Sequence, residues 1–265
     1  MALHMPDPFL TVMYQAVLAA EPSLLRDFGE VDKLQISIKG PGDFVSRADR
    51  KAESDIQEVL QTTFPGIGFQ MEETGKSGPQ DTCWVVDPLD GTLNFLHAVP
   101  HWCISVALKQ GKEITHGLIH DPIRNETFYA AKGAGAFLNR MRIRCSSRKN
   151  AGESVVAAAW QRPSSGEKAV FESKRRVDLL QRKTTAVRIT GSAALNFAYV
   201  AAGRFEGYYQ QGLDPWDCAA GVVIVQEAGG ITSRPDAGEF DPMIPQRPFL
   251  TSNSAVHDAL LQLIR

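Results

Sequence analysis

The sequence Cys83-Trp-Val-Val-Asp-Pro-Leu-Asp-Gly-Thr-Leu-Asn-Phe95 is the stretch around which the rest of the chain can be arranged. Its first part, Trp84–Val86, is a short apolar run of residues that favour strands, and it predicts a buried strand. Asp87 follows at the expected strand end. Pro88 has no backbone N–H and cannot continue a central strand, so we expect the strand to stop there.

Two carboxylates, Asp87 and Asp90, stand three residues apart in this stretch. They repel each other unless a cation, a proton or an arginine separates them. Gly91 lets the backbone approach a ligand closely. Thr92 is expected to cap a short helix through Leu96, which leaves N–H groups free for an anion. Metal-assisted phosphate chemistry is one interpretation. The other is an ordinary turn, because Asp, Pro and Gly are common turn residues.

The longer string resembles the signature of the inositol monophosphatase family. It runs Asp87-Pro-Leu-Asp-Gly-Thr-Leu-Asn-Phe95 and continues to His97, Pro100 and Ser105. A second stretch, Trp216-Asp-Cys-Ala-Ala-Gly221, is similar to the second signature of that family. The family belongs to a group of lithium-sensitive, magnesium-dependent phosphatases, and the resemblance extends over nearly the whole chain.

Composition sets wide limits on function. The chain has 265 residues, 43% of them hydrophobic and 22% charged, and a net charge of −2. Those values are ordinary for a globular protein and give no general argument for a nucleic-acid or membrane partner. No apolar run approaches the roughly 20 residues that span a bilayer. The four cysteines lack metal-finger spacing, so we expect free thiols and a cytoplasmic location.

The positive charge is concentrated in residues 140–188, which hold thirteen Lys or Arg and four Asp or Glu, a net +9. One interpretation is a solvated face on one half of the molecule. The other is a surface that meets an acidic partner, and some bacterial relatives also bind the transcription machinery. Arg140, Arg142 and Arg144 alternate, so they are expected to share the outward face of a strand.

Further acids lie upstream. An amphipathic helix is expected over Phe9–Asp27, kinked or ended at Pro22, and Asp49 lies in the first turn of a second helix. An acid there is also favoured by the helix dipole. A short strand, Ile67–Met71, ends in Glu72-Glu73, which either start an exposed loop or join Asp87 at a ligand site.

The pattern after residue 103 predicts a β-meander, with a hairpin from Ile104–Leu108 to Ile114–Ile119. A buried strand is expected at Val155–Trp160, then an exposed helix and loops over 161–183. Ser192 is expected to cap a helix of small residues. Pro215 suits the first turn of an all-apolar helix, so Asp217 would be a buried acid that either caps N–H groups or ligates a cation.

Carboxylates without His or Cys favour Mg²⁺ over zinc. The resemblance implies two or three Mg²⁺ ions. The first would take Glu72, Asp87 and the Leu89 carbonyl, and the second would be held by Asp87, Asp90 and Asp217. A third would be mostly water-bound near Glu72.

The resemblance also implies a mechanism in which a metal-bound water attacks phosphorus in line. Thr92, with Asp49 behind it, and Glu72 would orient that water. The N–H groups of Gly91 and Thr92 would hold phosphate oxygens. Lithium inhibition is expected.

Substrate contacts are implied at Asp90, Gly91, Thr92 and Asp217, and at Gly191, Ser192 and Ala193. Family members commonly have Glu shortly before the Trp-Asp motif, where this chain has Gln210. Glutamine donates and accepts hydrogen bonds but carries no charge, so other phosphate esters are open as substrates. A further departure is Met71, where the family usually has Gly before two Glu residues.

The resemblance implies an α+β fold, the layered α-β-α-β-α sandwich of the family. An N-terminal half, 1–150, would carry most metal ligands, and a C-terminal half, 151–265, would carry Asp217 and the substrate pocket. The leading function is Mg²⁺-dependent hydrolysis of inositol monophosphate by a homodimer. The alternatives are a phosphatase for phosphoadenosine phosphate, fructose-1,6-bisphosphate or histidinol phosphate, or a binding partner of the transcription machinery.

Overall fold

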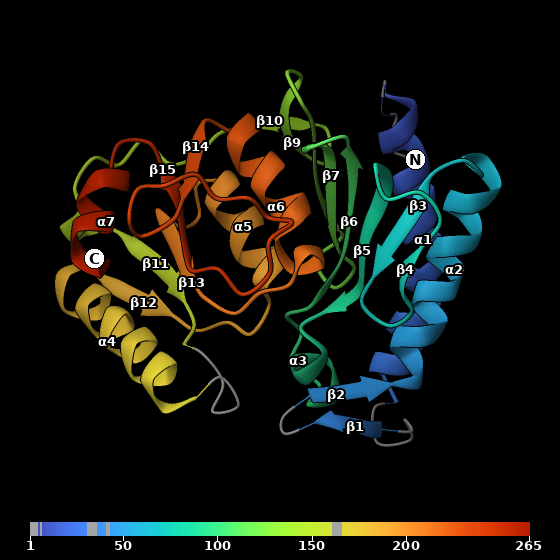
Figure 1. The fold of residues 1–265 in the computed structure, drawn as a ribbon, viewed down its shortest axis with the longest axis horizontal. Coiled ribbons are helices and arrows are strands. Elements are labelled where there is room, and N and C mark those ends of the chain that lie inside the picture. Colours follow the sequence, from blue (N-terminus) through green and yellow to red (C-terminus); the bar gives the residue numbers. More distant parts are fainter. Residues whose placement is uncertain (1–4, 6, 31–35, 41–42, 161–165) are drawn as a thin grey trace.

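The structure is a computed structural model that describes residues 5, 7–30, 36–40, 43–160 and 166–265 (Figure 1). In chain order, the helices of these residues are α1 (Pro8–Phe28), α2 (Arg47–Thr63), α3 (Thr92–Leu96), α4 (Glu167–Lys183), α5 (Ala193–Ala201), α6 (Pro215–Glu227) and α7 (His257–Ile264). A 3-10 turn spans Ala151–Glu153. None of these helices is both long and apolar enough to cross a bilayer.

The strands form two large sheets and one small pair. The eight-stranded sheet has the order β10 (Met141–Ile143), β9 (Gly135–Leu138), β8 (Glu126–Ala131), β7 (Glu113–Asp121), β6 (Cys103–Gln110), β5 (Thr82–Asp90), β3 (Gly68–Met71) and β4 (Gly75–Ser77). The five-stranded sheet has the order β12 (Ala186–Arg188), β11 (Val155–Ala158), β13 (Gly207–Gln210), β15 (Phe249–Asn253) and β14 (Gly230–Ser233). The small pair is β1 (Ile36–Gly40) with β2 (Asp43–Ser46).

Helices and sheets alternate in five layers. Figure 1 shows α1 and α2 on the outer face of the eight-stranded sheet, α5 and α6 between the two sheets, and α4 and α7 beyond the five-stranded sheet. The prediction of an α+β fold built as an α-β-α-β-α sandwich is confirmed. The division of the chain near residue 150 stays a prediction.

Three apolar clusters fill the spaces between these layers, as a layered fold requires. Met13, Val17 and Leu24 of α1 are fully buried in the first cluster, against the eight-stranded sheet. The second cluster packs α5 and α6 between both sheets, with Phe197 and Tyr208 at its centre. The third lies between the five-stranded sheet and the outer helices α4 and α7. Because α6 is apolar on nearly every face, it fits the central layer, which is covered on both sides.

The hairpin prediction is confirmed. Strands β6 and β7 pair antiparallel, and Gln110 faces Glu113 across the turn. Strands β8, β9 and β10 continue the predicted meander, each paired antiparallel with the strand before it. Of the helix and loops expected over 161–183, α4 is present, and residues 161–165 lie outside the described residues.

A proline lies inside each of two elements. The helix expected over Phe9–Asp27 is α1, which continues through Pro22 to Phe28, so of the two possibilities at Pro22, a kink or an end, the end is excluded. Proline removes one intrahelical hydrogen bond, and the buried Leu24 beyond it keeps the apolar face continuous. The expectation that the strand stops at Pro88 was wrong, because β5 continues past Pro88 to Asp90. Its pairing with β6 is interrupted between Asp87 and Asp90, so the missing N–H of Pro88 falls in an irregular part of the ladder.

Candidate active site

Three carboxylates from distant parts of the chain meet at one place. Asp87 and Asp90 come from the last residues of β5, and Asp217 comes from the first turn of α6. One carboxylate oxygen of each lies within 4.8 Å of the others. The Ser105 hydroxyl on β6 donates to the Trp216 carbonyl at 3.3 Å and holds the start of α6 against the sheet. The cluster therefore depends on the contact between α6 and the eight-stranded sheet.

An irregularity in β5 turns two of these acids to the same side. Residues three apart in a regular strand point to opposite faces. Here Asp87 faces Ser105 and Asp90 faces Cys103, so three steps along β5 match two steps along β6. The extra residue is a bulge, and it reverses the alternation of side chains. Asp87 and Asp90 thereby reach the same cation-sized space.

Asp90 also joins the two sheets through helix α5. Its carboxylate accepts hydrogen bonds from the Ser192 hydroxyl, from the Ala193 N–H at 3.1 Å and from the Ala194 N–H at 2.9 Å. These N–H groups open the first turn of α5, where a negative charge is stabilised. The predicted helix start at Ser192 is confirmed, with Asp90 as an additional cap.

The electrostatics of the cluster are unfavourable for three charged carboxylates. Burial raises the pKa of Asp87 well above its usual range, and the charges of Glu72, Asp90 and Asp217 raise it further. Burial and the charges of Glu72 and Asp90 likewise raise the pKa of Asp217. Burial also raises the pKa of Asp90, but the hydrogen bonds from Ser192 and from the first N–H groups of α5 act in the opposite direction and lower it. A divalent cation among these oxygens would remove the repulsion.

The donor set fits magnesium. All three clustered side chains offer hard oxygen ligands, and Glu72 lies close enough to perturb two of them. Asp217 also accepts the Asp214 N–H at 2.8 Å, which leaves its second oxygen available. Of the two roles considered for Asp217, capping and cation ligation, the structure allows both at once.

The family model described as "Inositol monophosphatase family" matches residues 5–265. The chain belongs to the inositol monophosphatase family. It is 42% identical over 258 residues to an inositol-1-monophosphatase from Mesorhizobium japonicum, covering 97% of this chain and 96% of that protein.

Two further relatives carry a different name. A protein named Nus factor SuhB from Xylella fastidiosa is 38% identical over 264 residues, covering 98% of this chain and 95% of that protein. The crystal structure of the extragenic suppressor protein suhB from Bartonella henselae superposes with a TM-score of 0.92 at 38% identity, covering 98% of this chain and 99% of that one. The inositol monophosphatase family is metal-dependent, and membership in it supports a phosphatase.

The start of α3 differs from the expectation for Thr92. Gly91 is the residue that caps this helix, with φ +91, and a Cβ there would lie 3.1 Å from the His101 carbonyl oxygen. Thr92 is the first helical residue, and its hydroxyl donates to the Leu89 carbonyl at 2.9 Å. The expectation that Thr92 caps α3 was therefore wrong, because only glycine fits the left-handed backbone that begins it. A carbonyl oxygen has two lone pairs, so Leu89 keeps one acceptor position.

Two acids on α2 lie on one face of that helix. Asp49 is buried in its first turn, at 3% exposure. Glu53, one turn later and 1% exposed, accepts the Glu73 N–H at 2.9 Å. Burial raises the pKa of Glu53. Glu53 therefore holds the turn that carries Glu72. Sequence reasoning missed this residue, although its spacing of four from Asp49 places both on the same face.

A second missed residue is Asn94. Its side-chain amide donates to the His101 carbonyl at 2.7 Å and to the Thr190 carbonyl at 2.9 Å. Gly191 follows with φ +89, and a Cβ there would lie 2.8 Å from the Asn94 side chain. Asn94 thus seats the loop before α5 on α3. No local pattern signals a bond between residues so far apart in sequence.

The structure brings most of the sequence-predicted residues to one region. Gln210 ends β13, is half-buried, and accepts a hydrogen bond from the Tyr208 hydroxyl. The predicted residues around the acid cluster are Asp87, Leu89, Asp90, Gly91, Thr92, Ser192, Ala193 and Asp217. The charge of Glu72 raises the pKa of Asp87, so Glu72 lies near the cluster. Gly191 lies against the side chain of Asn94 on α3.

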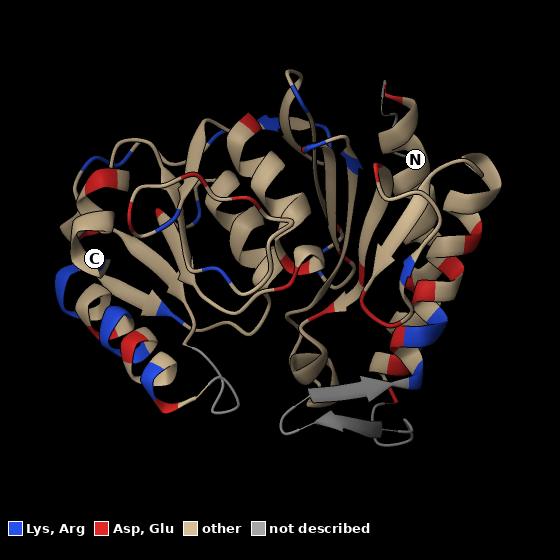
Figure 2. Ribbon diagram, in the orientation of Figure 1, with Lys and Arg blue, Asp and Glu red and all other residues tan. Residues whose placement is uncertain are grey.

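The described residues of the basic segment 140–188 lie on separate elements of the fold. Figure 2 shows basic residues on α4 at one end of the molecule and others beside β9 and β10. On α4, Arg175 pairs with Glu172 at 3.2 Å and Arg182 pairs with Asp178 at 2.9 Å. Exposed pairs of this kind are typical of a solvated helix face.

Proposed function

We propose that this chain hydrolyses inositol monophosphate to inositol and phosphate in a Mg²⁺-dependent reaction. The observation that carries the proposal is the meeting of Asp87, Asp90 and Asp217 in one cluster with oxygens within 4.8 Å of one another. Membership in the inositol monophosphatase family supports the phosphatase chemistry. The similarity to an inositol-1-monophosphatase at 42% identity supports inositol phosphate as the substrate.

The residues that would hold Mg²⁺ are the acids of the cluster, Glu72 and one backbone carbonyl. One ion would take Glu72, Asp87 and the Leu89 carbonyl, and another would take Asp87, Asp90 and Asp217. A third, mostly water-bound ion near Glu72 is part of the proposal. When bound, Mg²⁺ polarises the phosphate and lowers the pKa of water beside it.

The chain's own groups position the reactants. In the proposal, the N–H groups of Gly91 and Thr92 bind phosphate oxygens at the start of α3. Thr92, with Asp49 behind it, and Glu72 orient the attacking water. The Glu53 bond to the Glu73 N–H at 2.9 Å keeps the Glu72 turn in place. Since water attacks directly, no nucleophilic Cys or Ser is needed.

A substrate panel tests the proposal. Phosphate release is measured with Mg²⁺ on inositol 1-phosphate, glycerol 2-phosphate, fructose 1,6-bisphosphate, phosphoadenosine phosphate and histidinol phosphate, each with and without Li⁺. We expect the highest kcat/KM on inositol 1-phosphate, with activity lost in EDTA and reduced by Li⁺. The highest activity on another of these esters would keep the metal chemistry and replace the substrate. No activity on any of them from folded protein would refute the proposal.

A second candidate function rests on the relatives named Nus factor SuhB, one of them 38% identical. We propose, as the alternative, that the chain also binds the transcription machinery. The test is a pull-down of purified RNA polymerase by the wild-type chain and by Asp87→Asn. Binding that survives both the substitution and moderate salt would support a role separate from catalysis. Binding that disappears at moderate salt would be nonspecific charge attraction.

Assembly and location complete the proposal. The family resemblance leads us to propose a homodimer in the cytoplasm. The four cysteines are free, which agrees with a reducing compartment. Light scattering on the purified protein measures the assembly. A mass near twice the 29.0 kDa of one chain would support the dimer.

A further inference from the structure

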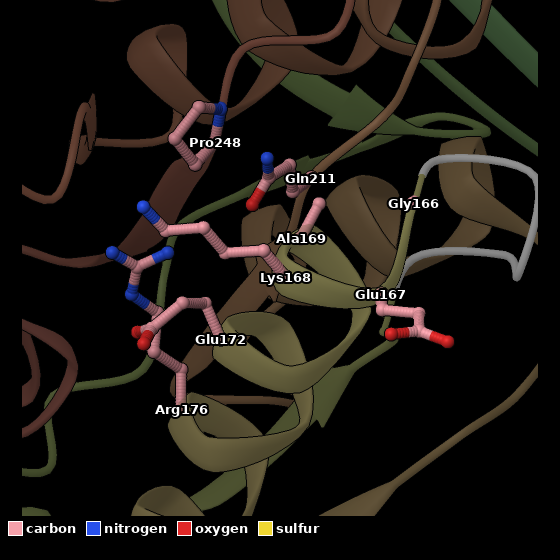
Figure 3. Close-up of a pocket in the computed structure, with 8 residues that line it drawn as sticks. All are labelled: Gly166, Glu167, Lys168, Ala169, Glu172, Arg176, Gln211 and Pro248. Atoms are coloured by element: carbon pink, nitrogen blue, oxygen red, sulfur yellow. The ribbon is translucent and has the colours of Figure 1, made fainter.

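An open cavity of about 590 Å³ lies between helix α4 and one end of the five-stranded sheet (Figure 3). Its walls are the first turns of α4, Gln211 directly after β13, and Pro248 directly before the neighbouring strand β15. Helix α4 covers the outer face of this sheet, whereas α6, which carries Asp217, lies on the inner face (Figure 1). The cavity is therefore separate from the acid cluster, and its volume suits a small organic molecule.

One wall of the cavity carries an arginine whose position is fixed. Arg176 is half-buried, and its Nε donates to the Ile264 carbonyl at 2.8 Å. The buried hydroxyl of Tyr209 lies next to the same guanidinium. None of the acids in the described part of the chain forms an ion pair with Arg176. A guanidinium held in this way is a preorganised donor for two oxygens of one anion.

A second cation, Lys168, lies eight residues before Arg176 and lines the same cavity. Glu172 lies between them, but its carboxylate pairs with Arg175 at 3.2 Å. Figure 3 shows the side chains of Lys168 and Arg176 extending to the same side of the cavity, whereas Glu167 extends the other way. Because Arg175 balances Glu172, the two cations leave the cavity with a net positive charge.

The start of α4 adds backbone donors to the same wall. Gly166 lines the cavity as the residue before the helix, and it has no side chain with which to cap the first N–H groups. Helix α4 has 17 residues, so its dipole places partial positive charge at this end. The cavity thus combines a fixed guanidinium, an ammonium group and helix N–H groups, and together these donors suit a phosphate dianion.

We propose that this cavity binds the phosphate group of a small organic phosphate, without a metal ion. Arg176 binds two phosphate oxygens, and Lys168 binds the third. Pro248 provides an apolar wall for the organic part of the ligand. The inference goes beyond the proposed phosphatase function and does not depend on it, because no residue of the acid cluster takes part.

The test is the binding of 4-fluorophenyl phosphate at pH 8 in EDTA, followed by the ¹⁹F signal of the ligand. EDTA removes metal ions, so the acid cluster repels this anion, and about 0.15 M NaCl screens attraction between exposed charges. We expect saturable binding to the wild-type chain. Arg176→Gln should raise the Kd about tenfold or more and Lys168→Gln about threefold or more, since each removes a charged donor.

The matched control is Arg182→Gln, which removes the same charge from the same helix. Arg182 is exposed, pairs with Asp178 at 2.9 Å and lies outside the cavity, so its substitution should leave the Kd within about twofold. 4-Fluorophenol, which has the ring without the phosphate, should not bind.

No saturable binding by the wild-type chain would overturn the inference. Equal losses of affinity in Arg176→Gln and Arg182→Gln would overturn it too, since attraction to net charge alone would explain them. If Arg176→Gln fails to fold, Lys168→Gln decides, because Lys168 is exposed and its substitution leaves the fold intact. Failure of the proposed phosphatase function would appear as lost phosphate release with Mg²⁺ and would leave this metal-free binding unchanged, so the two failures are distinguishable.

Discussion

Removing one acid from the cluster should make the metal-free protein more stable. The change is Asp87→Asn. Asp87 is 1% exposed, and the Leu89 N–H donates to its Oδ1 at 2.9 Å. An asparagine oxygen can accept that same bond. The substitution therefore removes the charge without removing the hydrogen bond.

The magnitude follows from the spacing of the acids. Two charges at the 4.8 Å limit of the cluster repel by about 3.5 kcal/mol at an effective dielectric constant near 20. Asp87 faces such a charge on Asp90 and on Asp217. Partial exposure of Asp217 reduces this cost. Partial uptake of a proton reduces it further, since the pKa values of Asp87 and Asp217 are raised. We expect the free energy of unfolding to rise by about 1–3 kcal/mol, or the Tm by about 2–8 °C.

The assay is thermal unfolding at pH 8 in EDTA, repeated with Mg²⁺. Mg²⁺ should raise the Tm of the wild-type protein and have a smaller effect on Asp87→Asn, since a ligand that binds only the folded state stabilises it. Asp121→Asn is the matched control. Asp121 is also buried, but it accepts the Arg124 N–H at 3.0 Å and pairs with the Arg124 guanidinium at 2.8 Å. Neutralising it should lower stability by about 1–3 kcal/mol.

Opposite signs for these two substitutions would support the account of the cluster. If Asp87→Asn lowered the metal-free Tm as much as Asp121→Asn does, the carboxylates would not be repelling one another. If Mg²⁺ raised the Tm of the wild-type protein and of Asp87→Asn by the same amount, the ion would bind elsewhere.

Three further predictions concern residues around the site and the core. Glu53→Ala should raise the Mg²⁺ concentration for half-maximal activity about tenfold, because it releases the Glu73 N–H, and Glu53→Gln should largely restore the wild-type value in the same titration. Gly191→Ala should lower the free energy of unfolding by about 1–3 kcal/mol in urea melts, since φ is +89 and Asn94 fills the space, while Gly229→Ala has the same backbone penalty without the clash. Burial lowers the pKa of His257, which lies between the Ser233 and Ser252 hydroxyls. Below about pH 6.5 the unfolded chain therefore binds more protons than the folded chain. The free energy of unfolding should decrease by up to about 1.4 kcal/mol for each pH unit by which the pH is lowered. In thermal melts from pH 7.5 to pH 5, His257→Gln should reduce this slope.

Much of the site was predictable because its signals are local. Asp87 and Asp90 follow a short run of strand-forming residues, and Asp217 opens an all-apolar helix. An acid at a strand end or in a buried helix needs a partner, so each pattern predicts a cation or a cap on its own. The sandwich itself was predicted from the resemblance to the family, and the all-apolar helix α6 agrees with a place between two layers.

The features that sequence reasoning missed are set by contacts across the fold. The bulge in β5 exists only in relation to β6, and no residue pattern fixes where its pairing resumes. The Asp90 bonds to α5 and the Asn94 bond to the Thr190 carbonyl join residues about a hundred positions apart. The predicted strand end at Pro88 was wrong for the same reason, because a strand can continue through a proline where its pairing with the neighbouring strand is irregular.

The specificity of the site was open for a different reason. Gln210 alone can donate or accept, so its identity leaves the substrate undecided. In the structure its amide oxygen accepts a hydrogen bond from the buried hydroxyl of Tyr208, a contact that the residue type alone does not predict.

The most direct test of the account is the initial rate of phosphate release from inositol 1-phosphate at saturating Mg²⁺, in wild type and in Asp87→Asn. The account predicts that the variant is folded, more stable without metal, and slower by about a thousandfold or more, since the carboxylate shared by both proposed ions is gone. A folded Asp87→Asn protein with near-normal turnover would contradict it.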